Sequence, residues 1–235
     1  MIIFDLGGVL LQEAELHLSS VLPAHVDIER MHGQTPRMFN RMFDFIDLIF
    51  GKPCKKDYFL GNISGCEIVK KIKDSVDQDE YKTFFKSTQE KNLILYGSEF
   101  VLLPQKEASL TRLDLDGLEF VKKCKKSGIR IMILSNWQLQ SFELIKNKFS
   151  ELFNLFDPDD IIIPAHVGFI KPEAEVYNHI IEKLKLDGSK TFFVDDVAKN
   201  VTAAKECGIR GVVHCNWKQT ENELLNNGLQ IYGKK

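Results

Sequence analysis

The stretch Ile2-Ile3-Phe4-Asp5-Leu6-Gly7-Gly8 joins a short apolar run to a carboxylate and two glycines at the beginning of the chain. An apolar run of this length before glycines predicts a buried strand that opens into a tight turn. In a sheet of alternating strands and helices, the loops that leave the carboxyl ends of the strands converge on one crevice. We therefore expect Asp5 to lie at such an edge, together with residues that end later strands.

Beyond Leu110 the chain alternates between strand and helix patterns. Strands are predicted at 129–134, 161–163, 191–194 and 212–213. Helices are predicted to stop at Gly128, to run through 139–149, to start at Pro172, to end near Gly208 and to be capped by Thr220 with Glu223. Strands separated by helices favour a parallel sheet. The predicted fold class is α/β, with a Rossmann-like parallel sheet and helices on both faces.

Residues 13–110 interrupt this alternation with helical spacing. Apolar residues between Met38 and Phe50 form a broad helical face, and Ser64 with Glu67 forms a capping box that predicts a helix start near Gly65. We interpret 13–110 as an inserted α-helical cap domain, and 1–12 with 111–235 as the core. The apolar face leaves two oligomeric states open, a monomer and a homodimer.

The composition is ordinary for a globular protein. The chain has 235 residues, 44% of them hydrophobic and 27% charged, with a formal net charge of -2. This balance predicts neither a nucleic acid partner nor binding to an acidic membrane. The five cysteines are widely spread without a Cys-x-x-Cys pair, which favours a reducing compartment. Because no basic leader or long apolar stretch is present, we expect a cytoplasmic protein without a membrane span.

Four places in the sequence carry chemistry, and each has a plainer interpretation when taken alone. Asp5 is as consistent with a solvated turn as with a presented nucleophile. The adjacent carboxylates of Asp195 and Asp196 repel each other and are stabilised by water or by a divalent cation such as Mg²⁺. Ser135 follows a strand, where most serines cap a helix or a turn. Lys171 precedes a predicted helix start. The helix dipole stabilises a bound anion there, whereas it does not stabilise a cation.

Together these places resemble the haloacid dehalogenase-like hydrolase superfamily, whose four motifs occur in this order. The matching segments are 4–10, 133–136, 168–173 and 193–196, with Asn200 further along. The resemblance covers nearly the whole chain outside the inserted helices, and the joint match is more specific than any one motif. The insertion of roughly a hundred residues after the first motif resembles the family's helical cap.

This resemblance implies a phosphatase that acts on a small-molecule phosphate monoester. Asp5 would be the catalytic nucleophile, forming an aspartyl-phosphate that water then hydrolyses. Ser135 and Lys171 would be catalytic groups that also bind the phosphoryl oxygens, with Asn136 as a further substrate-binding residue.

The resemblance also implies Mg²⁺ as the cofactor. The metal would be held by the Asp5 carboxylate, the Gly7 carbonyl and Asp196, with Asp195 acting through water. Asn200 is expected to steady the loop after the two aspartates rather than to take part in catalysis.

Gly7 departs from the family pattern. Family phosphatases usually carry a second aspartate at this position, as general acid for the leaving group and then base for the water. Because acid-base assistance contributes ~10²–10⁴-fold, we expect a preference for good leaving groups, as in aryl, acyl or anomeric phosphates. Two alternatives stay open: a metal-independent 2-haloacid dehalogenase, against which the pair Asp195-Asp196 argues, and a catalytically impaired phosphate-binding protein.

Overall fold

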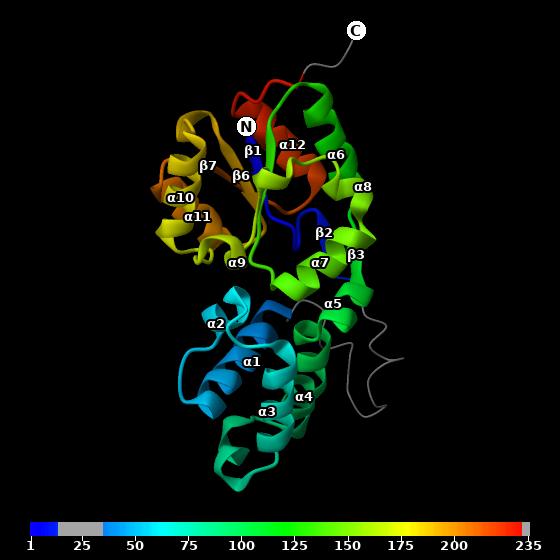
Figure 1. The fold of residues 1–235 in the computed structure, drawn as a ribbon, viewed down its shortest axis with the longest axis vertical. Coiled ribbons are helices and arrows are strands. Elements are labelled where there is room, and N and C mark those ends of the chain that lie inside the picture. The colour runs from blue at the N-terminus through cyan, green and yellow to red at the C-terminus, as the bar shows by residue number, and fades with distance from the viewer. Residues whose placement is uncertain (14–34, 232–235) are drawn as a thin grey trace. The chain divides into compact units, whose positions relative to one another are not determined.

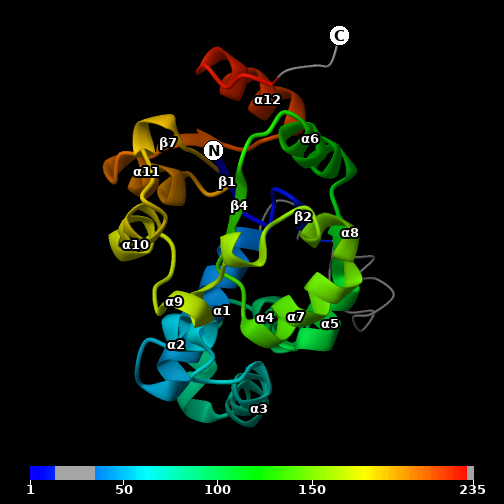
Figure 2. The ribbon, with the colours of Figure 1, turned by 45° about the horizontal axis from the view of Figure 1, so that its top comes forward.

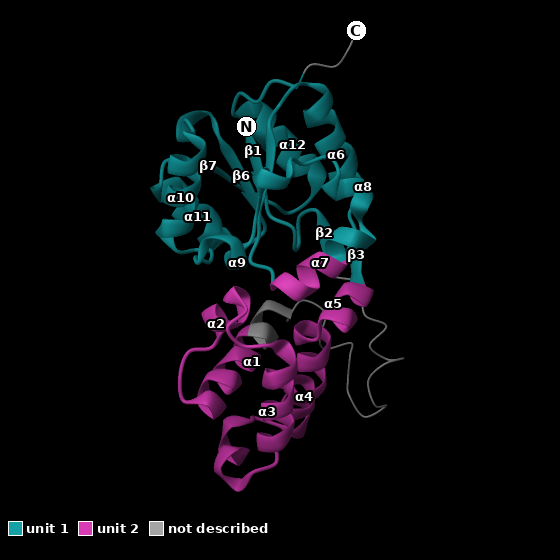
Figure 3. Cartoon of the chain, in the orientation of Figure 1, with its two compact units in different colours: residues 1–13, 111–137, 145–235 teal, residues 14–110, 138–144 magenta. Residues whose placement is uncertain are grey.

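The computed structural model describes residues 1–13 and 35–231, and the chain divides into two compact units (Figure 3). Unit 1 contains residues 1–13, 111–137 and 145–235, and unit 2 contains residues 14–110 and 138–144. The chain thus passes between the units near the positions at which the sequence analysis placed its boundaries. The stretch 138–144, which that analysis assigned to the core, groups with unit 2.

Unit 1 is built on a five-stranded parallel sheet with the strand order β5-β4-β1-β6-β7 (Figure 1). Its strands are β1 (Ile2–Phe4), β4 (Ile131–Leu134), β5 (Ile161–Ile162), β6 (Phe192–Asp195) and β7 (Arg210–Val213). All three residues of β1 are fully buried because this strand lies between β4 and β6. Apolar runs predicted each of these strands to within two residues, and the parallel sheet is confirmed.

The helices of unit 1 cover both faces of this sheet (Figure 2). They are α6 (Leu115–Lys126), α8 (Ser150–Phe153), α9 (Pro164–Val167), α10 (Ala174–Leu184), α11 (Ala198–Glu206) and α12 (Trp217–Asn226), with 3-10 turns at Pro158–Asp160 and Gly188–Lys190. A further helix, α7 (Leu139–Lys148), begins in unit 2 and ends in unit 1.

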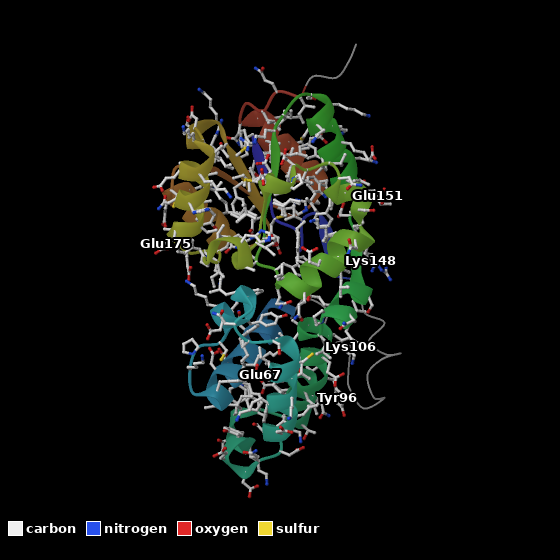
Figure 4. All side chains as sticks on the ribbon, in the orientation of Figure 1. Glu67, Tyr96, Lys106, Lys148, Glu151 and Glu175 are labelled. Carbon is white, nitrogen blue, oxygen red and sulfur yellow. The ribbon has the colours of Figure 1, made fainter. Side chains whose placement is uncertain are left out.

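Successive side chains of the central strand β1 point to opposite faces of the sheet and pack against different helices. Ile3 packs with Tyr177 of α10 and the neighbouring strand residue Phe193 on one face. Phe4 points to the other face, where its ring contacts Phe120 of α6 and Trp217 of α12. The outer side of α10 is polar, as Glu175 illustrates (Figure 4). The predicted α/β class with helices on both faces is therefore confirmed.

Two helix starts differ from the prediction. The helix expected at Pro172 begins at Ala174, because the preceding residues form a turn closed by the Glu173 N–H donating to the Ile170 carbonyl at 2.8 Å. The last helix begins at Trp217, and the prediction that Thr220 and Glu223 cap it is wrong.

Asn216 is the residue that caps this last helix. It has an extended backbone, and its side chain accepts a hydrogen bond from the Gln219 N–H at 2.9 Å. Asparagine is at least as good an N-cap as threonine, so the earlier residue takes that role. Thr220 is buried within the helix, with its hydroxyl 2.8 Å from Nδ1 of His214.

The regular elements in the described residues of unit 2 are all helices or helical turns. Its elements are α1 (Thr35–Phe50), α2 (Lys55–Leu60), α3 (Gly65–Ser75), a 3-10 turn (Asp79–Phe84), α4 (Thr88–Leu102) and α5 (Pro104–Leu110). The apolar face of α1 is buried from Met42 to Ile49, while the side chains of Met38 and Phe39 lie outside the described part. The predicted start of α3 is confirmed, since Ser64 accepts from the Glu67 N–H at 3.1 Å.

A short antiparallel ladder lies where the chain leaves unit 1 and returns to it. Strand β2 (Leu11–Glu13) pairs with β3 (Thr111–Leu113), so the two connections to the inserted helices are joined by backbone hydrogen bonds. Within the described ranges, none of the helices combines the length and the apolar character needed to cross a membrane. All five cysteines are free thiols.

Candidate active site

The candidate residues meet at the carboxyl edge of the sheet in unit 1. Asp5 follows the central strand β1, Ser135 follows β4 on one side of it, and Asp195 ends β6 on the other. Strand pairing fixes the positions of these residues along the strand direction, because the Asp5 N–H donates to the Val194 carbonyl at 2.9 Å. Parallel neighbours end at the same edge of a sheet, so three residues separated by up to 190 positions come together.

Lys171 brings a positive charge into this group. Its Nζ lies 2.8 Å from Oδ1 of Asp5 and 2.6 Å from Oδ2 of Asp195, and it also lies 5.5 Å from the centroid of the Phe193 ring. Lys171, Asp5 and Asp195 are all buried. A buried ion pair of this kind is stable only when it is also well hydrogen-bonded. Lys171 therefore connects the two carboxylates from β1 and β6.

Burial and charge act against each other at Asp5. Burial raises the pKa of Asp5 to about 7, although Lys171 and a hydrogen bond with the Ser135 side chain lower it and Asp195 raises it further. At Lys171 burial disfavours the ammonium, but Asp5 and Asp195 outweigh this effect and raise the pKa of Lys171. The two carboxylates thus favour the charged ammonium of Lys171, while burial disfavours the ionised carboxyl of Asp5 relative to an aspartate in water.

Protein groups occupy both oxygens of Asp195. Oδ2 accepts from Lys171, Oδ1 accepts from the Val197 N–H at 2.8 Å, and Nδ2 of Asn200 lies 3.1 Å from each oxygen. The sequence analysis expected Asn200 to steady the loop after the two aspartates. In the structure Asn200 holds the carboxylate of Asp195, and its role in steadying the loop stays a prediction.

Asp196 has a different environment. In residues 1–13 and 35–231, no other residue makes an ion pair or a hydrogen bond with its carboxylate. The carboxylate lies against the backbone of Gly8, where a Cβ would come 2.5 Å from Oδ2. Local burial and the charge of Asp195 raise the pKa of Asp196. The Gly-Gly pair predicts a tight turn here, but no sequence pattern signals the contact of Gly8 with Asp196.

The donor set fits a hard divalent cation. Oxygen atoms of Asp5, Asp195 and Asp196 all lie within 4.8 Å of one another. With these carboxylates ionised, Lys171 leaves two negative charges without compensation. Oxygen ligands are those that Mg²⁺ prefers, and Asp196 has the free carboxylate that such an ion requires.

Position 7 has no carboxylate, and an aromatic ring lies beside it. A Cβ built on Gly7 would lie 3.7 Å from Cζ3 of Trp137, which is an ordinary contact distance. The indole Nε1 of Trp137 is buried and has no hydrogen-bond partner among the described residues. The structure thus brings Trp137 next to the loop that follows Asp5.

Asn136 contacts Lys171 rather than the carboxylates. Its Nδ2 donates to the Lys171 carbonyl at 2.8 Å, and its Oδ1 accepts from the Lys171 N–H at 2.8 Å. The sequence analysis proposed Asn136 as a substrate-binding residue and did not find this pairing. No sequence pattern signals it, because the two residues lie 35 positions apart on different loops.

Comparison with known proteins identifies the family. The model of the haloacid dehalogenase-like hydrolases matches residues 1–208. The chain is 28% identical over 118 residues to sesquiterpene phosphatase astK of Aspergillus oryzae. The aligned stretch is 50% of this chain and 59% of that protein. It is 28% identical over 109 residues to drimenol cyclase drtB of Aspergillus calidoustus, which is 46% of this chain and 20% of that protein. The matched part is less than two thirds of either relative.

Solved structures have the same fold. A HAD family enzyme from Bacteroides thetaiotaomicron aligns with a TM-score of 0.59 at 17% identity, covering 94% of this chain and 97% of that chain. The same enzyme was also crystallised with magnesium and inorganic phosphate. A dehalogenase aligns with a TM-score of 0.56 at 16% identity, covering 90% of this chain and 83% of that chain. By its sequence match and its fold, this chain belongs to the haloacid dehalogenase-like hydrolase family.

Proposed function

We propose that this hydrolase is a magnesium-dependent phosphatase that cleaves a small-molecule phosphate monoester through an aspartyl-phosphate on Asp5. The observation that supports this most strongly is the environment of Asp5. Its carboxylate meets the Lys171 ammonium at 2.8 Å and lies in a group of three carboxylates that suits a divalent cation. A nucleophile, a cation for the phosphoryl oxygens and a metal site thus occupy one edge of the sheet.

The residues of the site have separate roles in phosphoryl transfer. A carboxylate oxygen of Asp5 forms a bond to phosphorus while the bond from phosphorus to the leaving oxygen breaks. Water then attacks the phosphorus, which releases inorganic phosphate and restores the carboxylate. Lys171 and Ser135 bind the phosphoryl oxygens, because this chemistry depends mainly on positioning and charge stabilisation.

We assign the metal site to the carboxylates of Asp5 and Asp196 and to the Gly7 carbonyl, with Asp195 contributing through water. When bound, Mg²⁺ supplies positive charge for the carboxylates and the phosphoryl group. Its binding favours the ionised form of Asp5, whose pKa burial raises to about 7. The free carboxylate of Asp196 supports this assignment.

The absence of a carboxylate at Gly7 bears on the substrate. Without a general acid there, leaving groups that depart without a proton are favoured, as in aryl, acyl and anomeric phosphates. The relative from Aspergillus oryzae is named a sesquiterpene phosphatase, which supports phosphatase chemistry on a small molecule. We propose that this hydrolase prefers such activated esters over simple alkyl phosphates.

A screen of the purified chain against aryl, acyl, sugar, nucleotide and amino-acid phosphates, with Mg²⁺ and with EDTA, tests the proposal. We expect magnesium-dependent phosphate release that is greatest with the activated esters, and its loss by at least about 10³-fold in Asp5→Asn. Equal turnover of alkyl and aryl phosphates would contradict the role of Gly7. Halide release from 2-haloacids without metal would instead favour the dehalogenase. Phosphate binding without turnover would favour the catalytically impaired protein.

A further inference from the structure

Two hydrogen bonds join the side chain of Asn136 to the backbone of Lys171. The amide donates to the Lys171 carbonyl and accepts from the Lys171 N–H, each at 2.8 Å. The pairing therefore resembles one rung of a sheet, formed by a side chain. Both residues belong to unit 1, in the loops that follow β4 and precede α10.

The backbone of Lys171 lies in a loop rather than in a regular element. Helix α9 ends at Val167, and α10 begins only at Ala174. A buried peptide group without a hydrogen-bond partner destabilises the folded chain, so a loop that carries a buried lysine needs such a partner. Asn136 supplies it, and at the same time it joins the Lys171 loop to the loop of Ser135.

The other end of Lys171 is also held. Its Nζ lies between Asp5 and Asp195, and Asn200 donates to both oxygens of Asp195. Asn136 thus holds the backbone of Lys171. Asn200 holds the carboxylate of Asp195, which forms an ion pair with the Lys171 ammonium. Because the stem of lysine is flexible, the position of Nζ depends on both ends.

We propose that Asn136 is a positioning residue that acts on the reaction through Lys171. This inference rests on the proposed function in one respect, namely that Lys171 binds the phosphoryl oxygens. It revises the expectation that Asn136 binds the substrate itself. One N–H of the amide is not used by Lys171, so direct contact with substrate is the competing role that an experiment must separate.

A double-mutant cycle separates the two roles. Asn136→Leu, Lys171→Met and the double variant are compared by kcat/KM for an aryl phosphate with Mg²⁺. We expect Asn136→Leu to lower kcat/KM by about 10–100-fold, because a small misplacement of a catalytic group costs this much. In the Lys171→Met background the same change should cost less than about 2-fold. Losses that multiply would overturn the proposal, since Asn136 would then act independently of Lys171.

Control variants and a binding measurement distinguish effects on folding, on ligand binding and on turnover. Asn227→Leu removes an exposed amide that also donates to a backbone carbonyl, at Glu223, and it should leave kcat/KM unchanged. If Asn136→Leu does not fold, Asn136→Asp replaces it in the cycle, because it keeps the acceptor for the Lys171 N–H. If Lys171→Met has no measurable turnover, the same cycle is measured as orthovanadate affinity by calorimetry.

The two proposals fail in different ways. A wild-type chain that binds orthovanadate but hydrolyses no phosphate ester contradicts the proposed function, while the orthovanadate cycle still decides the role of Asn136. A wild-type chain with phosphatase activity and an additive cycle keeps the function and removes the inference. If the wild-type chain neither turns over phosphate esters nor binds orthovanadate, both proposals are wrong.

Discussion

The two aspartates that end β6 are neighbours in sequence, yet they lie in opposite environments. Asp195 is fully buried, and Lys171, Asn200 and the Val197 N–H occupy its oxygens. Asp196 is exposed as a residue, although its carboxylate lies against Gly8, and within the described ranges this carboxylate has neither an ion pair nor a hydrogen bond from another residue. One carboxylate is satisfied by the protein, and the other remains available to a ligand.

This difference separates two regions of the site. In the lysine region, Asp5, Lys171 and Asp195 form a buried network whose charges the protein itself balances in part. In the glycine region, the loop of Gly7 and Gly8 brings backbone close to Asp196 without bringing a positive charge. The lysine region should therefore matter for the stability of the metal-free protein, and the glycine region for metal binding.

The largest expected effect is on stability, in a matched pair of variants. Asp195→Asn should lower the free energy of unfolding by about 3 kcal/mol or more, because it removes one partner of a buried ion pair. Asp196→Asn should change it by less than about 1 kcal/mol or stabilise the protein, since no partner among residues 1–13 and 35–231 is lost and a repulsion is relieved. Urea unfolding in EDTA at pH 8 measures both. Equal destabilisation by the two variants would remove the distinction between the regions.

The second effect is on magnesium. Asp196→Asn should weaken Mg²⁺ binding by at least about 100-fold, because it removes a carboxylate that no other described residue pairs with or hydrogen-bonds. Titration calorimetry measures the affinity, and the magnesium-dependent rise in Tm provides an independent measurement. Asn200→Ala serves as the control, since it perturbs Asp195 and leaves the Asp196 carboxylate in place. Unchanged magnesium affinity in Asp196→Asn would show that the ion binds elsewhere.

The lysine and glycine regions also differ in how far the sequence predicts them. Apolar runs locate the strands, and parallel topology then places Asp5, Ser135 and Asp195 at one edge. That much follows from local patterns. The position of Lys171 depends on the irregular loop between α9 and α10, whose path has no periodicity.

Sequence patterns cannot predict hydrogen bonds between residues that lie on different loops. The hydrogen bonds of Asn136 with Lys171, and of Asn200 with Asp195, arise only once the sheet has brought their loops together. The start of the last helix shows the same limitation at short range. Two N-cap candidates, Asn216 and Thr220, compete there, and tertiary packing buries the second.

The third prediction compares the two glycines. Gly8 has a φ of 72°, and a Cβ there would come 2.5 Å from Oδ2 of Asp196, so Gly8→Ala should destabilise the protein by about 2 kcal/mol and weaken magnesium binding. At Gly7 the nearest atom would lie 3.7 Å away, so Gly7→Ala should cost less than about 1 kcal/mol. Urea unfolding and magnesium titration of both variants provide the test. A larger cost at Gly7 would contradict this description of the loop.

The smallest expected effect is that of pH on magnesium affinity, and it involves both regions. Burial raises the pKa of Asp5 to about 7 in the metal-free protein, and burial with the charge of Asp195 raises that of Asp196. Because Mg²⁺ binds ionised carboxylates, its affinity should be constant well above pH 7 and fall by roughly tenfold per unit below it. Calorimetry between pH 5.5 and 8.5 measures this, with proton release read from two buffers. Asp5→Asn should remove the part of the dependence that belongs to Asp5, whereas an affinity constant down to pH 5.5 would show that the carboxyl is already ionised there.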